Sequence, residues 1–299
     1  MKSFINPKYL LLMALTTGLT FSACSSVNNE VESLSEEDIQ FAAEIAASSL
    51  ADDESGLISS MYDAFSNVDA TGIFYFDGRS KSGPRGNGGR GRERNYSFSY
   101  DSLTGVHTIS YERIVENNRY SKSVSTLQEI IYTDLDGEFI ARPRAERDSI
   151  EAIVFNSNKT GSYEDTTKTS SFTKTDSFDI TGVHSTNTIL TMDGTHTGIG
   201  DAEGALNDST SARSYEINLT YENVEINKDT VEVYGNLENG VSGTITYSIS
   251  MSETINGIPQ ETLVEGVIDL EEDDGTALMR FDRIDRVIRF SLKDGKRRN

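Results

Sequence analysis

From about residue 73 onward, apolar and polar residues alternate with a period of two, and this pattern restricts most of the chain to β-strands. The clearest example covers residues 244–252, where the apolar members that alternate with Thr and Ser are Ile245, Tyr247, Ile249 and Met251. Successive side chains of a strand point to opposite faces of a sheet. The alternation therefore predicts strands with one buried face and one solvated face.

Turn-forming dipeptides separate the alternating segments. Asn-Gly or Asp-Gly occurs at 77–78, 136–137, 193–194, 239–240, 256–257, 274–275 and 294–295. Between alternating segments these dipeptides favour the tight turns of β-hairpins. A partner strand for 244–252 follows the dipeptide at 256–257; it covers 262–270 and carries Val264, Ile268 and Leu270 on one face. The pattern predicts an antiparallel β domain over residues 72–299.

A short helical segment is predicted at 35–66, ahead of the strands. Ser35 precedes three acidic residues, as is typical of a helix N-terminus, and apolar residues then recur at helical spacing. Leu57 begins a second short helix. About 30 helical residues cover only part of a sheet of roughly ten strands, so we expect the sheet to curl into a half-barrel or barrel-like form. The expected fold is mainly β, a curved antiparallel meander with a short N-terminal helical pair.

A curled sheet with limited helical cover leaves room for an apolar hollow. The side chains expected to line it come from the two clearest strands: Ile245, Tyr247, Ile249, Met251, Val264, Ile268 and Leu270. Such a hollow suits an apolar or lipid ligand. The same side chains form an ordinary core if the sheet closes or flattens onto the helices.

Composition excludes several classes of protein. The 299 residues carry a formal net charge of −21, 36% are hydrophobic, and there is one cysteine. These values argue against a polytopic membrane protein, a disulfide scaffold, a thiolate metal site and a generally basic nucleic-acid binder.

Positive charge gathers in a Gly/Arg-rich loop predicted at 78–94. Its arginines are Arg79, Arg85, Arg90, Arg92 and Arg94. This loop is either a solvated segment or a contact surface for anionic headgroups or lipopolysaccharide phosphates.

Motifs for catalysis, metals and cofactors are missing from the sequence. Three scattered histidines show no metal-ligand spacing, and there is no Gly-x-Ser-x-Gly elbow. Residues 86–91 match Gly-x-Gly-x-x-Gly, but their flanks indicate a loop and a strand instead of the strand and helix that a dinucleotide site requires. We therefore expect no enzyme activity, no metal and no cofactor.

The first 23 residues have the pattern of a secretory signal. Two lysines precede an apolar stretch that is shorter than the roughly 20 residues of a membrane-spanning helix. The residues Phe21-Ser22-Ala23-Cys24 resemble the lipobox of bacterial lipoproteins. The resemblance implies that residues 1–23 are removed, that Cys24 carries acyl chains, and that 24–34 form a lipidated tether. Ser25 after the cysteine implies sorting to the outer membrane, facing either the periplasm or the cell surface.

Three functional hypotheses follow from these observations. The first is an envelope lipoprotein that binds an apolar or lipid ligand in its curved sheet. The second is a structural or interaction lipoprotein without a ligand pocket, which contacts the membrane through its acyl chains. The third is an unrecognised enzyme or metal protein, which would require histidines and carboxylates gathered in one cleft.

Overall fold

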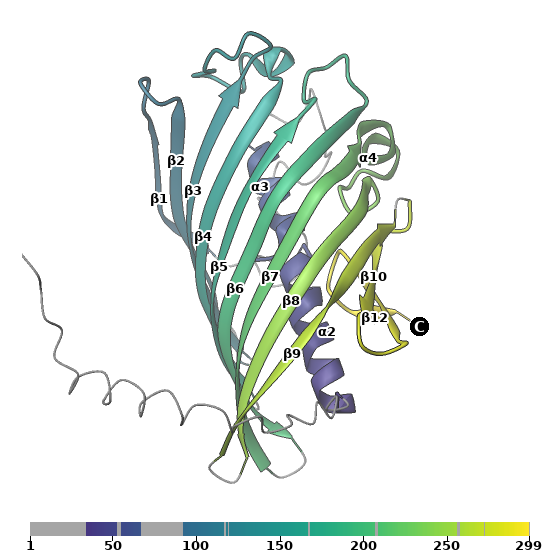
Figure 1. Cartoon of the computed structure of the whole chain (residues 1–299). Helices are drawn as coiled ribbons and strands as arrows, with labels where there is room; N and C mark the ends of the chain where they lie inside the picture. Colours follow the sequence, from purple (N-terminus) through teal and green to yellow (C-terminus); the bar gives the residue numbers. More distant parts are fainter. Residues whose placement is uncertain are drawn as a thin grey trace, which may run out of the picture. The chain divides into compact units, whose positions relative to one another are not determined.

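Twelve antiparallel strands form one continuous sheet, and their order in space is their order in the sequence (Figure 1). The computed structural model describes residues 34–52, 55–66, 92–116, 118, 120–166, 168–206, 209–255, 258–271 and 273–298. The strands in that part of the chain are β1 (Arg92–Tyr100), β2 (Val106–Glu116), β3 (Tyr120–Thr133), β4 (Ala152–Asp165), β5 (Lys168–Thr181), β6 (Ile189–Leu206), β7 (Ser209–Asn227), β8 (Val241–Ile255), β9 (Ile258–Glu271), β10 (Thr276–Phe281), β11 (Val287–Ser291) and β12 (Arg297–Arg298).

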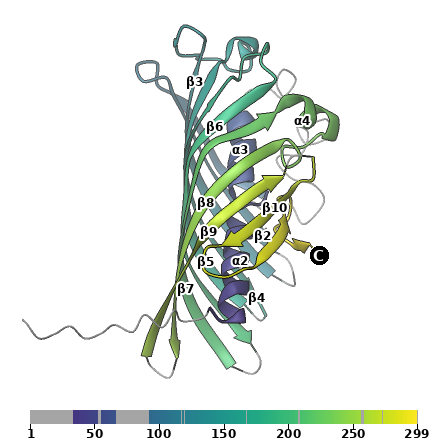
Figure 2. The ribbon, with the colours of Figure 1, turned by 45° about the vertical axis from the view of Figure 1, so that its right-hand side comes forward.

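The meander predicted from alternation and turn dipeptides is confirmed. The expected strands 244–252 and 262–270 lie inside β8 and β9, and Ile249 pairs with Val264 across them. The sheet is open, because β1 and β12 end the strand order without pairing with each other. It therefore takes the form of an open curved sheet instead of a closed barrel (Figure 2).

Two N-terminal helices lie on the concave face of this sheet (Figures 1 and 2). They are α2 (Glu36–Leu50) and α3 (Leu57–Ser66), within the segment predicted to be helical. The apolar stripe of α2 is buried, including Ala42 and Ala46. The apolar face of a β-sheet must be buried against another element, and these two helices bury part of it.

Two smaller helical segments connect strands. A short 3₁₀ turn (Arg147–Ser149) precedes β4, and α4 (Lys228–Tyr234) joins β7 to β8. The side chain of Asn227 caps α4 by accepting from two backbone N–H groups, and Gly235 ends it with a φ of 69°. None of the helices in the described part of the chain has the length and apolar character needed to cross a bilayer.

Gly266 of β9 is required by a close approach between neighbouring strands. Tyr247 of β8 pairs with Gly266 and sends its hydroxyl past it to donate to the Arg280 carbonyl at 3.0 Å. A Cβ at residue 266 would lie against both the Tyr247 hydroxyl and the Arg280 carbonyl oxygen. The absence of a side chain thus allows the buried tyrosine hydroxyl to be satisfied.

The expected Gly/Arg-rich loop at 78–94 overlaps strand β1 at its C-terminal end. Strand β1 starts at Arg92 and pairs with β2, so residues 92–94 belong to the sheet and the expected loop boundary at 94 is wrong. These three residues are all charged and carry no alternation of polar and aromatic residues; their pairing with 112–114 of β2 makes them part of the strand. Cys24, Arg79, Arg85 and Arg90 lie outside the described residues.

Candidate functional site

Two rows of side chains on the concave face of the sheet change from polar to apolar between β6 and β7. One row of cross-strand partners runs Gln128, Ser157, Asp176, His196, Leu219 and Tyr247. The adjacent row runs Thr126, Lys159, Lys174, Gly198, Ile217 and Ile249. The polar half, on β3 to β6, is where α3 makes its hydrogen bonds to the sheet. Buried ionisable groups with close charged partners are frequent at functional sites, so this half is a candidate site.

Asp176 is the centre of this polar half. Its carboxylate accepts three hydrogen bonds: from Nδ1 of His196 at 2.7 Å, from the Ser60 hydroxyl of α3 at 2.5 Å, and from the Ser157 hydroxyl at 2.9 Å. An ionised carboxylate only accepts, so Nδ1 of His196 must carry a proton in this arrangement. Asp176 and His196 have no exposed surface.

Lys159 lies beside Asp176 and links it to a second carboxylate. Its Nζ donates to the Ser60 hydroxyl at 2.7 Å and forms an ion pair with Asp63 of α3 at 3.4 Å. Asp63 also accepts from Nε2 of Gln128 at 2.8 Å. We call Ser60, Asp63, Lys159, Asp176 and His196 the buried charge cluster. It fastens α3 to three neighbouring strands, β4, β5 and β6.

Lys174 fastens the other helix. Its Nζ donates to the backbone carbonyl of Ser48, in the last turn of α2, at 2.9 Å. The last turn of α2 has no basic residue of its own. A lysine placed there by the sheet satisfies an otherwise unpaired carbonyl and opposes the negative end of the helix dipole.

Asp176 contributes to the stability of the protein toward acid. Burial alone would raise the pKa of Asp176, but the charge and hydrogen bond of His196, with the charge of Lys159, lower the pKa to about 2 from a usual 3.8. The unfolded chain therefore takes up this proton at a higher pH than the folded protein does. The resulting stabilisation is complete above pH 4 or so and is lost as the pH falls toward 2.

We expect urea unfolding to reveal this loss. Between pH of about 5 and about 3, the free energy of unfolding should fall more steeply for the wild type than for Asp176→Asn, which has no proton to gain there. The difference between the two proteins should amount to about 1 kcal/mol between these pH values, out of about 2.5 kcal/mol over the whole transition. Parallel curves for the two proteins would show that Asp176 does not titrate with the lowered pKa.

The chemistry available to the cluster is limited by its burial. A serine hydroxyl within 2.7 Å of a lysine amine is a geometry found in nucleophilic catalysis. Ser60, Lys159 and Asp176 nevertheless have no exposed surface, so no substrate atom can approach them unless α3 moves. Nε2 of His196 is buried and has no hydrogen-bond partner in the described part of the chain. The arrangement therefore holds the helix and sheet together without presenting a reactive group.

Metal-binding geometry is also missing from the described part of the molecule. Within the described ranges, no three residues among His, Cys, Asp and Glu are gathered so that they would hold an ion. The cluster contains one histidine and two carboxylates, but Lys159 and two serines occupy the space between them.

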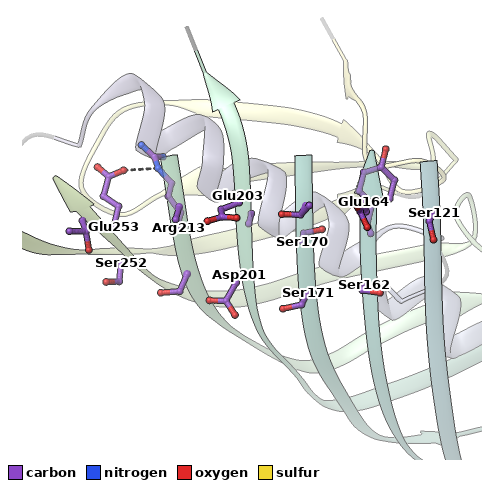
Figure 3. A pocket seen from close by; sticks show the side chains of 16 residues that line it. Ser121, Ser162, Glu164, Ser170, Ser171, Asp201, Glu203, Arg213, Ser252 and Glu253 are labelled. Carbon is purple, nitrogen blue, oxygen red and sulfur yellow. Dashed lines mark hydrogen bonds and ion pairs between the residues drawn. The ribbon is translucent and has the colours of Figure 1, made fainter. Parts of the chain in front are cut away.

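A polar hollow of about 550 Å³ lies at the hairpin ends of β3 to β8 (Figure 3). Four of its labelled side chains, Ser162, Ser171, Asp201 and Ser252, point to one side of the sheet. They alternate along their strands with inward-facing residues, so this side is the outer face. At one end Arg213 forms an ion pair with Glu253 at 2.7 Å. Its lining consists mostly of residues with hydroxyls and carboxylates, together with Ala202 and Ala212.

The seven side chains expected to line an apolar hollow are brought together as expected. All lie on the concave faces of β8 and β9, and their exposed fractions range from 0 to 7%. Ile245, Ile249 and Ile268 have no exposed surface. Of the arginines proposed to meet anionic surfaces, only Arg92 and Arg94 lie in the described part of the chain, where they belong to β1.

Sequence reasoning missed the buried charge cluster. The signal was available in β4 and β5: Lys159 is four residues from Phe155 and Asp176 two from Phe178, so each shares the face of a buried aromatic residue. A charge at such a position is either solvated or paired. Whether it is solvated or paired depends on which residues lie opposite it on the neighbouring strands, and the sequence of a single strand does not give that register.

Comparison with known proteins leaves this chain without a match among protein-family models, curated proteins or solved structures.

Proposed function

We propose that this chain is a lipid-anchored envelope protein with a structural or interaction role, attached to the outer membrane through acyl chains on Cys24. The observation that carries the role is the filling of the concave face. Ile245, Ile249 and Ile268, which a bound acyl chain would have to touch, have no surface that even a water molecule reaches. Ligand sites normally keep an accessible apolar lining. These side chains are packed as a core.

The proposed partner is an envelope component that meets the outer face of the sheet. This face is exposed and carries hydroxyls and carboxylates, as the hollow at the hairpin ends illustrates (Figure 3). Asp201 and Glu203 add negative charge there. A surface of this kind recognises polar partners through hydrogen bonds, and it excludes anionic nucleic acid by repulsion.

Uptake of a fluorescent fatty acid tests the proposal against the apolar-ligand alternative. The delipidated, monomeric protein is expected not to bind the probe at micromolar concentrations. Saturable binding of one probe per chain, abolished by Ile249→Trp with the fold intact, would reinstate a lipid carrier and overturn the structural role.

The substitution Ile249→Trp also has an expected effect on stability. In a filled core the larger side chain overpacks its surroundings, which should lower the free energy of unfolding by about 1–3 kcal/mol. Ser250→Trp is the matched control, because residue 250 is exposed on the same strand. The control should change stability by less than about 0.5 kcal/mol in chemical denaturation. Equal stability of both variants would indicate that the space around Ile249 is not filled.

A further inference from the structure

We propose that a second hollow, between the 236–239 loop and the ends of β10 and β11, binds a small ligand that carries a primary amine and a phosphate. The hollow measures about 390 Å³. This volume is within the range of roughly 300–1,000 Å³ that is usual for small-molecule sites. The residues that carry the inference are Glu238, Arg289, Lys293 and Arg298, all of which line it.

Glu238 is the residue that favours an amine as the ligand. Its side chain is 3% exposed and borders the hollow. One carboxylate oxygen, Oε2, accepts from the Tyr62 hydroxyl of α3 at 2.6 Å. The other, Oε1, is buried and accepts no hydrogen bond from any residue in the described part of the chain. A buried carboxylate oxygen without a donor is unfavourable, and an ammonium group supplies both the donor and the opposite charge.

The position of Glu238 is fixed from two sides. The Tyr62 hydroxyl also accepts from the backbone N–H of Leu237 at 2.9 Å, so α3 holds both the loop and the carboxylate. Across the hollow, Asn239 donates to the backbone carbonyl of Asp273 at 2.8 Å, which ties the loop to the β9–β10 turn. The carboxylate is therefore presented by a preorganised loop.

Besides Glu238, the charged residues that line the hollow are three cations, Arg289, Lys293 and Arg298, and one carboxylate, Asp274. Arg289 is already paired, with Asp274 at 3.1 Å and with Glu271 at 3.2 Å. Lys293 and Arg298 are exposed, and neither forms an ion pair within the described ranges of the chain. One carboxylate oxygen without a donor and two cations without an ion pair thus lie at the hollow, and a small turn of the Glu238 side chain would bring its buried Oε1 to a ligand there. A phosphorylated primary amine, with one positive charge and up to two negative charges, matches that set.

O-phosphoethanolamine is the probe for this site, measured by calorimetry on the full-length lipidated protein in detergent. We expect saturable one-to-one binding. Ethyl phosphate lacks the amine, and phosphocholine keeps the positive charge but has no N–H to donate. Both should bind at least about tenfold more weakly than O-phosphoethanolamine, because Glu238 Oε1 stays without a donor.

Three variants locate the site. Glu238→Gln and Lys293→Gln should each weaken O-phosphoethanolamine about tenfold or more. Glu232→Gln is the control, because Glu232 is exposed on α4 six positions earlier in the chain and should leave binding unchanged. If Glu238→Gln does not fold, the comparison of the three ligands on the wild type still decides the role of the amine.

The source of the ligand is distinguished by reconstitution. In phosphatidylcholine vesicles the protein should bind soluble O-phosphoethanolamine. Adding phosphatidylethanolamine should weaken this apparent affinity if the site takes lipid headgroups, and should leave it unchanged if the site takes only the free molecule. The proposal is overturned if O-phosphoethanolamine does not bind at millimolar concentration, if ethyl phosphate binds equally well, or if Glu238→Gln binds like the wild type.

Discussion

Asp176→Asn is expected to lower the free energy of unfolding by about 3–5 kcal/mol, the largest effect that we expect from any single substitution in the described part of the chain. Asn keeps the size of the side chain and removes its charge. Lys159 then retains only Asp63 as an anionic partner in the cluster, at 3.4 Å. The amide oxygen of Asn can still accept from Nδ1 of His196, but the NH₂ group takes the place of the oxygen that accepted from the Ser60 and Ser157 hydroxyls. Breaking one member of a buried charge network leaves the others uncompensated in a poorly solvating interior.

The matched control for this substitution is Asp179→Asn. Asp179 lies on the same strand, three residues away, but it is exposed on the outer face. Its substitution should change the free energy of unfolding by less than about 0.5 kcal/mol. Urea denaturation of both variants at neutral pH gives the comparison. Similar stability of the two variants would mean that the cluster does not hold α3 on the sheet.

A second substitution separates charge from packing in the same region. Lys159→Met removes the cation while keeping an unbranched side chain, and leaves Asp63 and Asp176 facing each other across Ser60. If the cluster acts as a network, the double variant Lys159→Met with Asp176→Asn should lose less stability than the sum of the two single variants.

The fold was predictable because it depends on patterns that lie within single segments. The alternation in 244–252 and 262–270 identified β8 and β9, and the acidic start at Glu36 identified α2. Both strands extend beyond these alternating segments, because the hydrogen-bonded pairing of β8 with β9 continues up to the hairpin turn between them. Arg92 shows the same effect, because pairing with β2 extends β1 over three charged residues, 92–94.

The site was not predictable because it depends on which strands lie next to each other. Asp176 and His196 are 20 residues apart, and Ser60 is a further 116 residues from Asp176. No spacing in the sequence distinguishes this set from the many other Ser, Asp and Lys residues of the chain. The apolar hollow was expected because the cover was counted only in helical residues. Side chains of the sheet itself, such as Lys159 and Gln128, are also buried on the concave face and add to that cover.

Cys24→Ser is expected to move the protein from the membrane fraction almost completely into the soluble fraction. Each buried CH₂ of an acyl chain contributes about 0.8 kcal/mol, so two or three chains hold a protein durably and their loss removes the attachment. Residues 24–299 carry a net charge of −23, because residues 1–23 contain two lysines and no acidic residue. An anionic membrane surface therefore gives them little attraction as a whole.

Ser26→Ala is the control for this experiment, since it changes a tether residue and leaves Cys24 in place. It should stay with the membrane. Washing with high salt separates the two modes of attachment, because salt screens electrostatic contacts such as those proposed for Arg79 and Arg85 and leaves acyl insertion intact. If the Cys24→Ser protein still sedimented with membranes after that wash, another part of the chain would be the anchor and the lipoprotein assignment would fail.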